Sequence, residues 1–203
     1  VWLSMSRAAS DESPVGFGID LVYGALGGIQ GTGAGGGLNG GGNDLWLSQA
    51  YIEYAAGGVT LTAGKFATHI GYEVAGAANN VNITRGFTWG LLQPVAQIGA
   101  KLSGEAGGLG WMIGVTNGLG ANQVDVDGKK DLIWQIGWGN DSMTVLFNGE
   151  WGSDAEHYGN FVPKENALTL DGILELTPSD NLFLWTNLTG VKVDSATPGI
   201  GDV

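Results

Sequence analysis

The sequence predicts an all-β protein, an antiparallel transmembrane β-barrel of the outer-membrane type with about nine or ten visible strands. Apolar and polar side chains alternate with the period of two that is typical of strands. The alternating runs are about ten residues long, whereas strands of soluble proteins most often have about 5–6 residues. Very short turns alternate with long connections, which is the asymmetry of outer-membrane barrels.

The clearest hairpin joins residues 131–140 to residues 143–151 through the turn sequence Asn140-Asp141-Ser142. In its first run Leu, Trp, Ile and Trp occupy every second position, and Asp, Ile, Gln and Gly stand between them. One face is therefore apolar and the other face is largely polar or small.

Eight further runs fit the same pattern, and three short turns join six of them into hairpins. The expected strands are 1–6, 15–26, 45–56, 59–67, 94–105, 109–118, 167–176 and 181–191. The expected turns are Gly57-Gly58, Ala106-Gly107-Gly108 and Thr177-Pro178-Ser179-Asp180. Long connections are expected near 27–44, 68–93, 119–130 and 152–166, within a single domain that spans 1–203.

The composition favours a membrane barrel over a water-soluble protein. Only 14% of the residues are charged, against roughly 25% in a typical soluble domain. Alternation alone does not separate a barrel from a β-sandwich, so a soluble sandwich or adhesin domain remains an alternative. Tryptophan near strand ends favours the barrel, because aromatic side chains prefer the bilayer interfaces. These residues are Trp46, Trp111, Trp138 and Trp151.

Charge and motifs exclude several functions. A net charge of −12 argues against nucleic-acid binding. The GxGxxG match at Gly31, Gly33 and Gly36 is not followed by a helix pattern, so no nucleotide site is predicted. His69 and His157 are far apart and cysteine is absent, so no metal, no cofactor and no catalytic site is predicted.

Six short pieces, in order, resemble a known family. They are Gln49-Ala50-Tyr51, Gly64-Lys65-Phe66, Gly71-Tyr72-Glu73, residues 80–85, residues 94–99 and Thr116-Asn117-Gly118. Together they resemble the β-barrel porins of the OmpL-like or porin-2 group. The resemblance implies a channel for small solutes in the outer membrane of a Gram-negative bacterium. It also implies a longer chain, so we expect these strands to be part of a larger barrel.

We therefore expect a passive pore rather than an enzyme, with a polar, acidic lumen that favours cations. Charge on the lipid face would cost about 2–4 kcal/mol at the bilayer midplane, which places charged strand residues in the lumen. The pore-lining or constriction candidates are Glu53, Lys65, Glu73, Arg85, Lys101, Glu150, Asp171 and Glu175.

The connection at 68–93 is the most informative one. We expect it to fold inward and narrow the pore, with Glu73 and Arg85 setting a transverse field. The alternative is an outer loop in which the two form a solvated ion pair of little energetic value.

The expected partners are the lipid bilayer with its lipopolysaccharide, small solutes or ions, and further copies of the chain in a homo-oligomer such as a trimer. A structural outer-membrane barrel that sheathes or anchors a partner protein is the main alternative function.

Overall fold

The computed structural model describes residues 1–23, 45–82, 84–94, 96–118, 128–152 and 166–194. They form one sheet of ten antiparallel strands, in which every strand pairs with its neighbours in sequence. The strands are β1 (Trp2–Arg7), β2 (Val15–Tyr23), β3 (Leu45–Ala56), β4 (Val59–Ala67), β5 (Ala96–Ala106), β6 (Leu109–Thr116), β7 (Asp131–Asn140), β8 (Met143–Gly152), β9 (Ala167–Ser179) and β10 (Leu182–Val193). The all-β prediction is confirmed.

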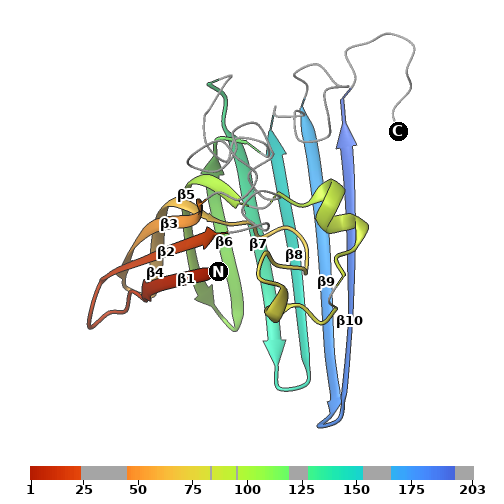
Figure 1. The fold of residues 1–203 in the computed structure, drawn as a ribbon. Coiled ribbons are helices and arrows are strands. Elements are labelled where there is room, and N and C mark those ends of the chain that lie inside the picture. The colour runs from red at the N-terminus through yellow and green to blue at the C-terminus, as the bar shows by residue number, and fades with distance from the viewer. Residues whose placement is uncertain (24–44, 83, 95, 119–127, 153–165, 195–203) are drawn as a thin grey trace.

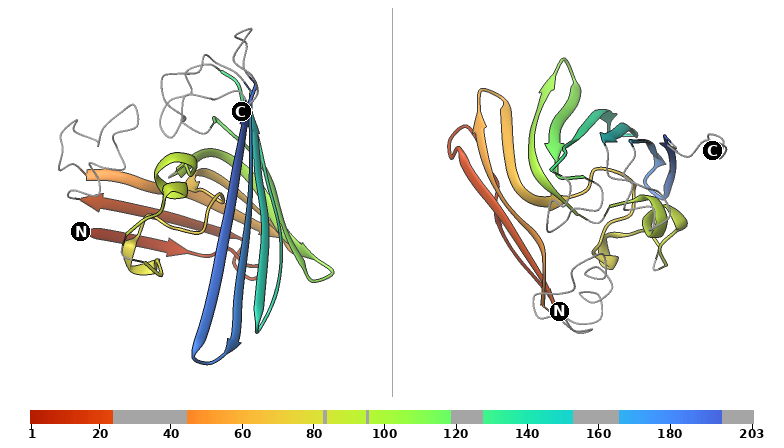
Figure 2. Two further views of the ribbon diagram at one scale, coloured as in Figure 1. Left: turned by 90° about the vertical axis from the view of Figure 1, so that its right-hand side faces the viewer. Right: turned by 90° about the horizontal axis from the view of Figure 1, so that it is seen from above.

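The sheet is strongly curved, and seen from above it bends around one side like part of a barrel wall (Figure 2). In the described part of the chain β1 and β10 are its two edges, and the sheet is not closed. The helical turns η1 (Ala77–Asn79) and η2 (Thr88–Leu92) lie between β4 and β5 on the concave side (Figures 1 and 2). No helix in the described ranges is long and apolar enough to cross a membrane.

Short turns close the β3–β4, β5–β6 and β7–β8 hairpins. Gly57 and Gly58 have φ angles of 59° and 78°, which suit the left-handed turn that follows the twist of paired strands. In the β7–β8 hairpin the Asn140 side-chain oxygen accepts the backbone N–H groups of Ser142 and Met143 at 2.9 and 3.0 Å. These turns match the sequence prediction.

The turn predicted at 177–180 is wrong in its position. Strand β9 continues to Ser179, and the register shifts so that Thr177 and Pro178 stand opposite Phe183 alone. Proline has no N–H to donate to the strand ladder, so it is tolerated at a bulge. Pro178 therefore sits inside a bulged strand end and does not form the turn.

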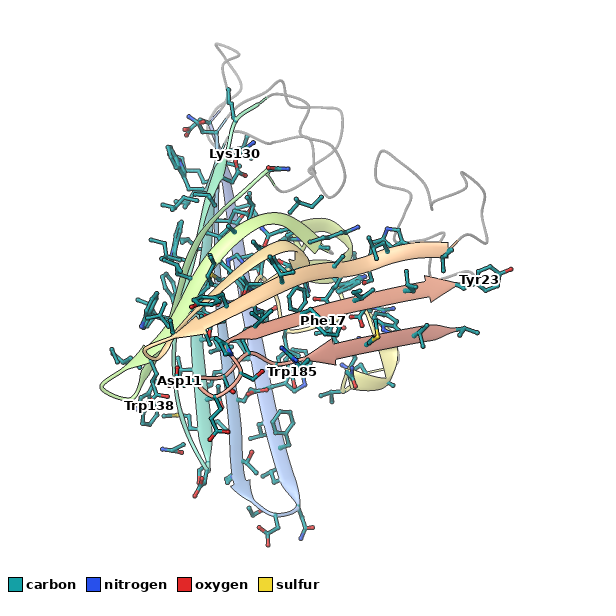
Figure 3. The ribbon with its side chains drawn as sticks, turned by 90° about the vertical axis from the view of Figure 1, so that its left-hand side faces the viewer. Asp11, Phe17, Tyr23, Lys130, Trp138 and Trp185 are labelled. Atoms are coloured by element: carbon teal, nitrogen blue, oxygen red, sulfur yellow. The ribbon has the colours of Figure 1, made fainter. Side chains whose placement is uncertain are left out.

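The convex face carries the apolar side chains. On β7 and β8 the side chains of Ile136 and Phe147, which are register partners, are 52% and 49% exposed. Aromatic residues occur at both ends of this face. Tyr23 projects at the end of β2, and Trp138 lies at the short-turn end of β7 (Figure 3). Trp151 lies at the end of β8 that leads to a long connection, and its side chain is 50% exposed.

The prediction that Trp46 is one of these interface aromatics is wrong. Its side chain is 2% exposed, and the Lys65 ammonium lies 4.6 Å from the centroid of its ring. The register between β2 and β3 shifts between Asp20 and Leu21, next to Trp46, and this bulge changes the simple alternation.

The concave side holds the core. Phe66, Met112 and Ile133 form its apolar cluster, against which Tyr51 packs. Most of the largest fully buried side chains in the described ranges are polar, which is unusual for a soluble protein. Examples are Gln97, Asn148, Glu150 and Asp171.

Candidate functional site

Residues 68–93, which we call the inward segment, connect β4 to β5 and run along the concave side of the sheet toward β8–β10 (Figure 2). The His69 ring nitrogen Nε2 lies 3.0 Å from the carbonyl oxygen of Gly149 on β8. Ile70 follows it and is fully buried. The chain therefore packs one of its long connections against the inside of the curved sheet.

Asp171 on β9 attaches the inward segment to the strands. Its Oδ2 accepts the backbone N–H of Gly71 at 3.1 Å and the side-chain amide of Asn148 at 2.8 Å. Its Oδ1 accepts the Asn187 amide at 2.5 Å and the Thr189 hydroxyl at 2.6 Å. The carboxylate is 1% exposed, and these four donors replace the water that it loses.

A second attachment uses β10. The Tyr72 ring stacks on the Trp185 ring, with centroids 4.3 Å apart and planes 13° apart. The Tyr72 backbone N–H donates to the side-chain oxygen of Asn187 at 3.3 Å. Burial and then the nearby Glu175 carboxylate raise the pKa of Tyr72, so the ring stays neutral at physiological pH.

The predicted pair Glu73 and Arg85 lies within the inward segment itself. Glu73 Oε2 accepts the backbone N–H of Gly86 at 2.8 Å. The Arg85 guanidinium donates to the carbonyl oxygens of Val74 and Ala75. No ion pair joins the two side chains in this described stretch. Both side chains therefore hydrogen-bond to the backbone of the inward segment itself. Their role in a transverse field across the pore stays a prediction.

Amide side chains make further hydrogen bonds across the sheet, and one of them reaches Glu150. The amide of Gln97 on β5 donates to Glu150 Oε1 at 2.8 Å, and Glu150 is fully buried. The amide of Gln135 on β7 donates to Asn148 at 2.7 Å, and Asn148 in turn donates to Asp171. The two predicted carboxylates Glu150 and Asp171 thus each accept an amide side chain, Glu150 from Gln97 and Asp171 from Asn148.

Sequence reasoning missed these amides. The sequence did contain a signal for these polar residues. Asn148 and Glu150 are two residues apart on β8, and Asn187 and Thr189 are two residues apart on β10. The strand period places each pair on one face.

The remaining candidates lie apart from this network. The Lys101 ammonium is 4.4 Å from the centroid of the Phe66 ring. Lys65 on β4 is 8% exposed and contacts Trp46. Glu53 on β3 reaches the backbone N–H of Ala9 at 3.5 Å. Whether these residues line a conducting pore stays a prediction.

Two cavities flank the inward segment. The first, which we call the acidic cavity, has about 660 Å³ and lies between the segment and β1–β3, at the strand ends that lead to the long connections. Its walls include Trp2, Asp20, Gln49, Glu73, Trp89 and Gln93. The second, the short-turn cavity, has about 870 Å³ and lies toward the β5–β6 and β7–β8 turns. Its walls include His69, Lys101, Glu105, Trp111, Gln135 and Thr144.

His69 stands at the boundary between the segment and the short-turn cavity. Burial is the main cause that lowers its pKa from 6.5 to about 4, and nearby Lys101 lowers the pKa further. The hydrogen bond to the Gly149 carbonyl opposes the shift. The ring is therefore neutral at pH 7, with Nε2 as the donor to that carbonyl oxygen.

In the described ranges no group of three or more potential ligand side chains is arranged to hold a metal ion. The glycine pattern at Gly31, Gly33 and Gly36 and the residue His157 lie outside the described residues.

A curved sheet of sequential antiparallel strands with an apolar convex face and a polar concave side is the arrangement of a barrel wall. The family model described as Putative beta-barrel porin-2, OmpL-like matches residues 1–202. The chain belongs to this family. Membership of the porin-2 family implies an outer-membrane porin role, and such families are generally not enzymes. Comparisons with curated proteins and with solved structures gave no match.

Proposed function

We propose that this porin-2 protein lets small hydrophilic solutes and ions diffuse passively through a water-filled lumen that the inward segment narrows. The observation that carries the proposal is the attachment of Gly71 and Tyr72 to Asp171 and Asn187 on the facing strands. A connection fixed across the concave side reduces the width of any passage there, and pore width and lining charge set selectivity.

The charge of the concave side supports a preference for cations. Asp20 and Glu73 line the acidic cavity, and Glu105 lines the short-turn cavity together with Lys101 and His69. The whole chain carries a net charge of −12. A negatively charged passage concentrates cations and repels anions over distances of about 10 Å at 0.1 M salt.

Planar lipid bilayers test this function directly. We expect the folded, reconstituted protein to give discrete current steps, and a KCl gradient to give a reversal potential of the sign that cation flow requires. A folded protein that inserts without current would overturn the proposal in favour of a structural barrel that sheathes or anchors a partner.

A further inference from the structure

The acidic cavity is large enough to hold a small organic molecule. Its volume of about 660 Å³ falls within the roughly 300–1,000 Å³ of typical small-molecule sites. One wall is the inward segment, and the other is formed by β1–β3. Because the cavity lies beside the segment, a solute in the lumen would meet it at the narrowed region.

The charge of the cavity is one-sided. Asp20 and Glu73 are the charged side chains among the described residues that line it, and no Lys, Arg or His is among them. Asp20 accepts the side-chain amide of Gln49 at 2.5 Å, and Glu73 accepts the backbone N–H of Gly86. These donors are neutral, and the nearby Arg85 guanidinium donates to the carbonyl oxygens of Val74 and Ala75 rather than to either carboxylate, so the cavity attracts a positively charged occupant.

Of the two indole rings that line the cavity, the Trp2 ring adds a preference for an organic cation. Tryptophan is the side chain whose ring face binds cations best. The Arg85 guanidinium already lies 4.7 Å from the centroid of the Trp89 ring. Trp2 lines the opposite wall with 37% of its surface exposed, and no cation from the described residues lies over its ring.

Gln93 is a further, independent feature of the wall. Its side chain is 3% exposed, and its amide nitrogen donates to the carbonyl oxygen of Glu73. Its Oε1 has no hydrogen-bond partner. A buried acceptor without a donor is costly, so this wall of the cavity carries an unmet demand for an N–H or O–H donor.

We propose that the acidic cavity is a binding site for small aliphatic amines, whose protonated ammonium groups are held by Asp20 and Glu73 and whose methylene groups lie against Trp2. This deepens and rests on the proposed porin function, since the amine would be a solute that the lumen selects. Anions are repelled, and neutral solutes of the same size gain nothing from the carboxylates.

The test compares 1,4-diaminobutane with 1,4-butanediol, a neutral probe of the same length, by isothermal titration calorimetry on the folded protein in detergent. We expect the diamine to bind and the diol to give no measurable binding. Asp20→Asn and Glu73→Gln should each weaken diamine binding by about tenfold or more, since each keeps an oxygen for its Gln49 or Gly86 partner. Glu105→Gln, which makes the same charge change in the short-turn cavity, should leave the affinity unchanged.

Equal binding of diamine and diol, absence of diamine binding, or an equal loss in Glu105→Gln would overturn the site. The unsubstituted protein decides the first two outcomes even if a variant does not fold. Failure of the site is distinguishable from failure of the porin function, because binding in detergent needs no current. A protein that conducts but ignores the diamine refutes only the site, and one that binds the diamine without conducting refutes only the porin function.

Discussion

At the scale of single residues, a buried carboxylate and a buried imidazole hold the inward segment. Asp171 accepts four hydrogen bonds at 1% exposure, and His69 donates to the Gly149 carbonyl as a neutral ring. The cost of a charge on a lipid-facing surface predicted that Asp171 would point to the polar side of the sheet. The sequence could not show that Gly71, 100 positions earlier, would be the partner of Asp171, because that contact depends on how the sheet curves.

Replacing Asp171 tests the attachment. Asp171→Asn turns one accepting oxygen into an N–H donor that faces other donors, and an unsatisfied buried group costs about 1–3 kcal/mol. We expect faster hydrogen exchange at the amides of Gly71 and Tyr72 in the reconstituted protein. Asp141→Asn, in the β7–β8 turn, is the matched control and should leave exchange there unchanged. Unaltered exchange in Asp171→Asn would contradict the role of this carboxylate.

We also expect low pH to weaken the attachment of the inward segment to the sheet. The pKa of His69 is lowered to about 4 when buried, whereas a solvated imidazole titrates near 6.5. The released ring therefore binds a proton below pH 6.5 while the buried ring does not, so docking weakens progressively as the pH falls from 6.5 to 4. Above pH 6.5 the His69 ring is neutral in both the attached and the released segment, so it adds no pH dependence to the attachment.

The measurement is hydrogen exchange at the amides of Gly71 and Tyr72 at pH 7 and pH 5, corrected for the intrinsic exchange rate. In His69→Gln, whose amide can donate to the same carbonyl without titrating, we expect this loss of protection to disappear. A loss of equal size in His69→Gln would assign the pH effect to other groups.

At the scale of elements, the strands could be predicted from the sequence, whereas the β-bulges could not. The runs 45–56, 59–67 and 131–140 match β3, β4 and β7 residue for residue, because each has strong alternation and a tight turn beside it. The bulges beside Trp46 and at Pro178 were missed, since a bulge is a response to neighbouring strands. The course of the inward segment likewise depends on tertiary contacts.

Gly71 is the element-scale position most sensitive to change. Its φ is +84°, and a Cβ there would lie 2.1 Å from Gln93 Oε1. Gly71→Ala should therefore displace the segment at a cost of about 1–2 kcal/mol or more, and single-channel conductance should rise. Gly76→Ala is the control within the same segment, because its Cβ would meet nothing closer than 3.4 Å. Equal conductance in the two variants would contradict a fixed constriction.

At the scale of the whole molecule, the proposed pore depends on two faces of the sheet with different surroundings. The alternation predicted that one face would meet lipid and the other water, and the structure separates these side chains onto a convex and a concave side. Sequence alone could not distinguish this arrangement from a sandwich. Family membership and the covered polar side together favour a membrane barrel with a polar interior.

Single-cysteine labelling tests whether the two faces meet lipid and water, because these 203 residues contain no cysteine. Thr144 lines the short-turn cavity, and the adjacent Val145 is on the opposite face of β8. With a charged, membrane-impermeant thiol reagent applied during bilayer recording, we expect Thr144→Cys to react and lose current, and Val145→Cys to stay unmodified in lipid. Rapid labelling of both cysteines, or a reaction at residue 144 without any change in current, would contradict a lipid-embedded pore.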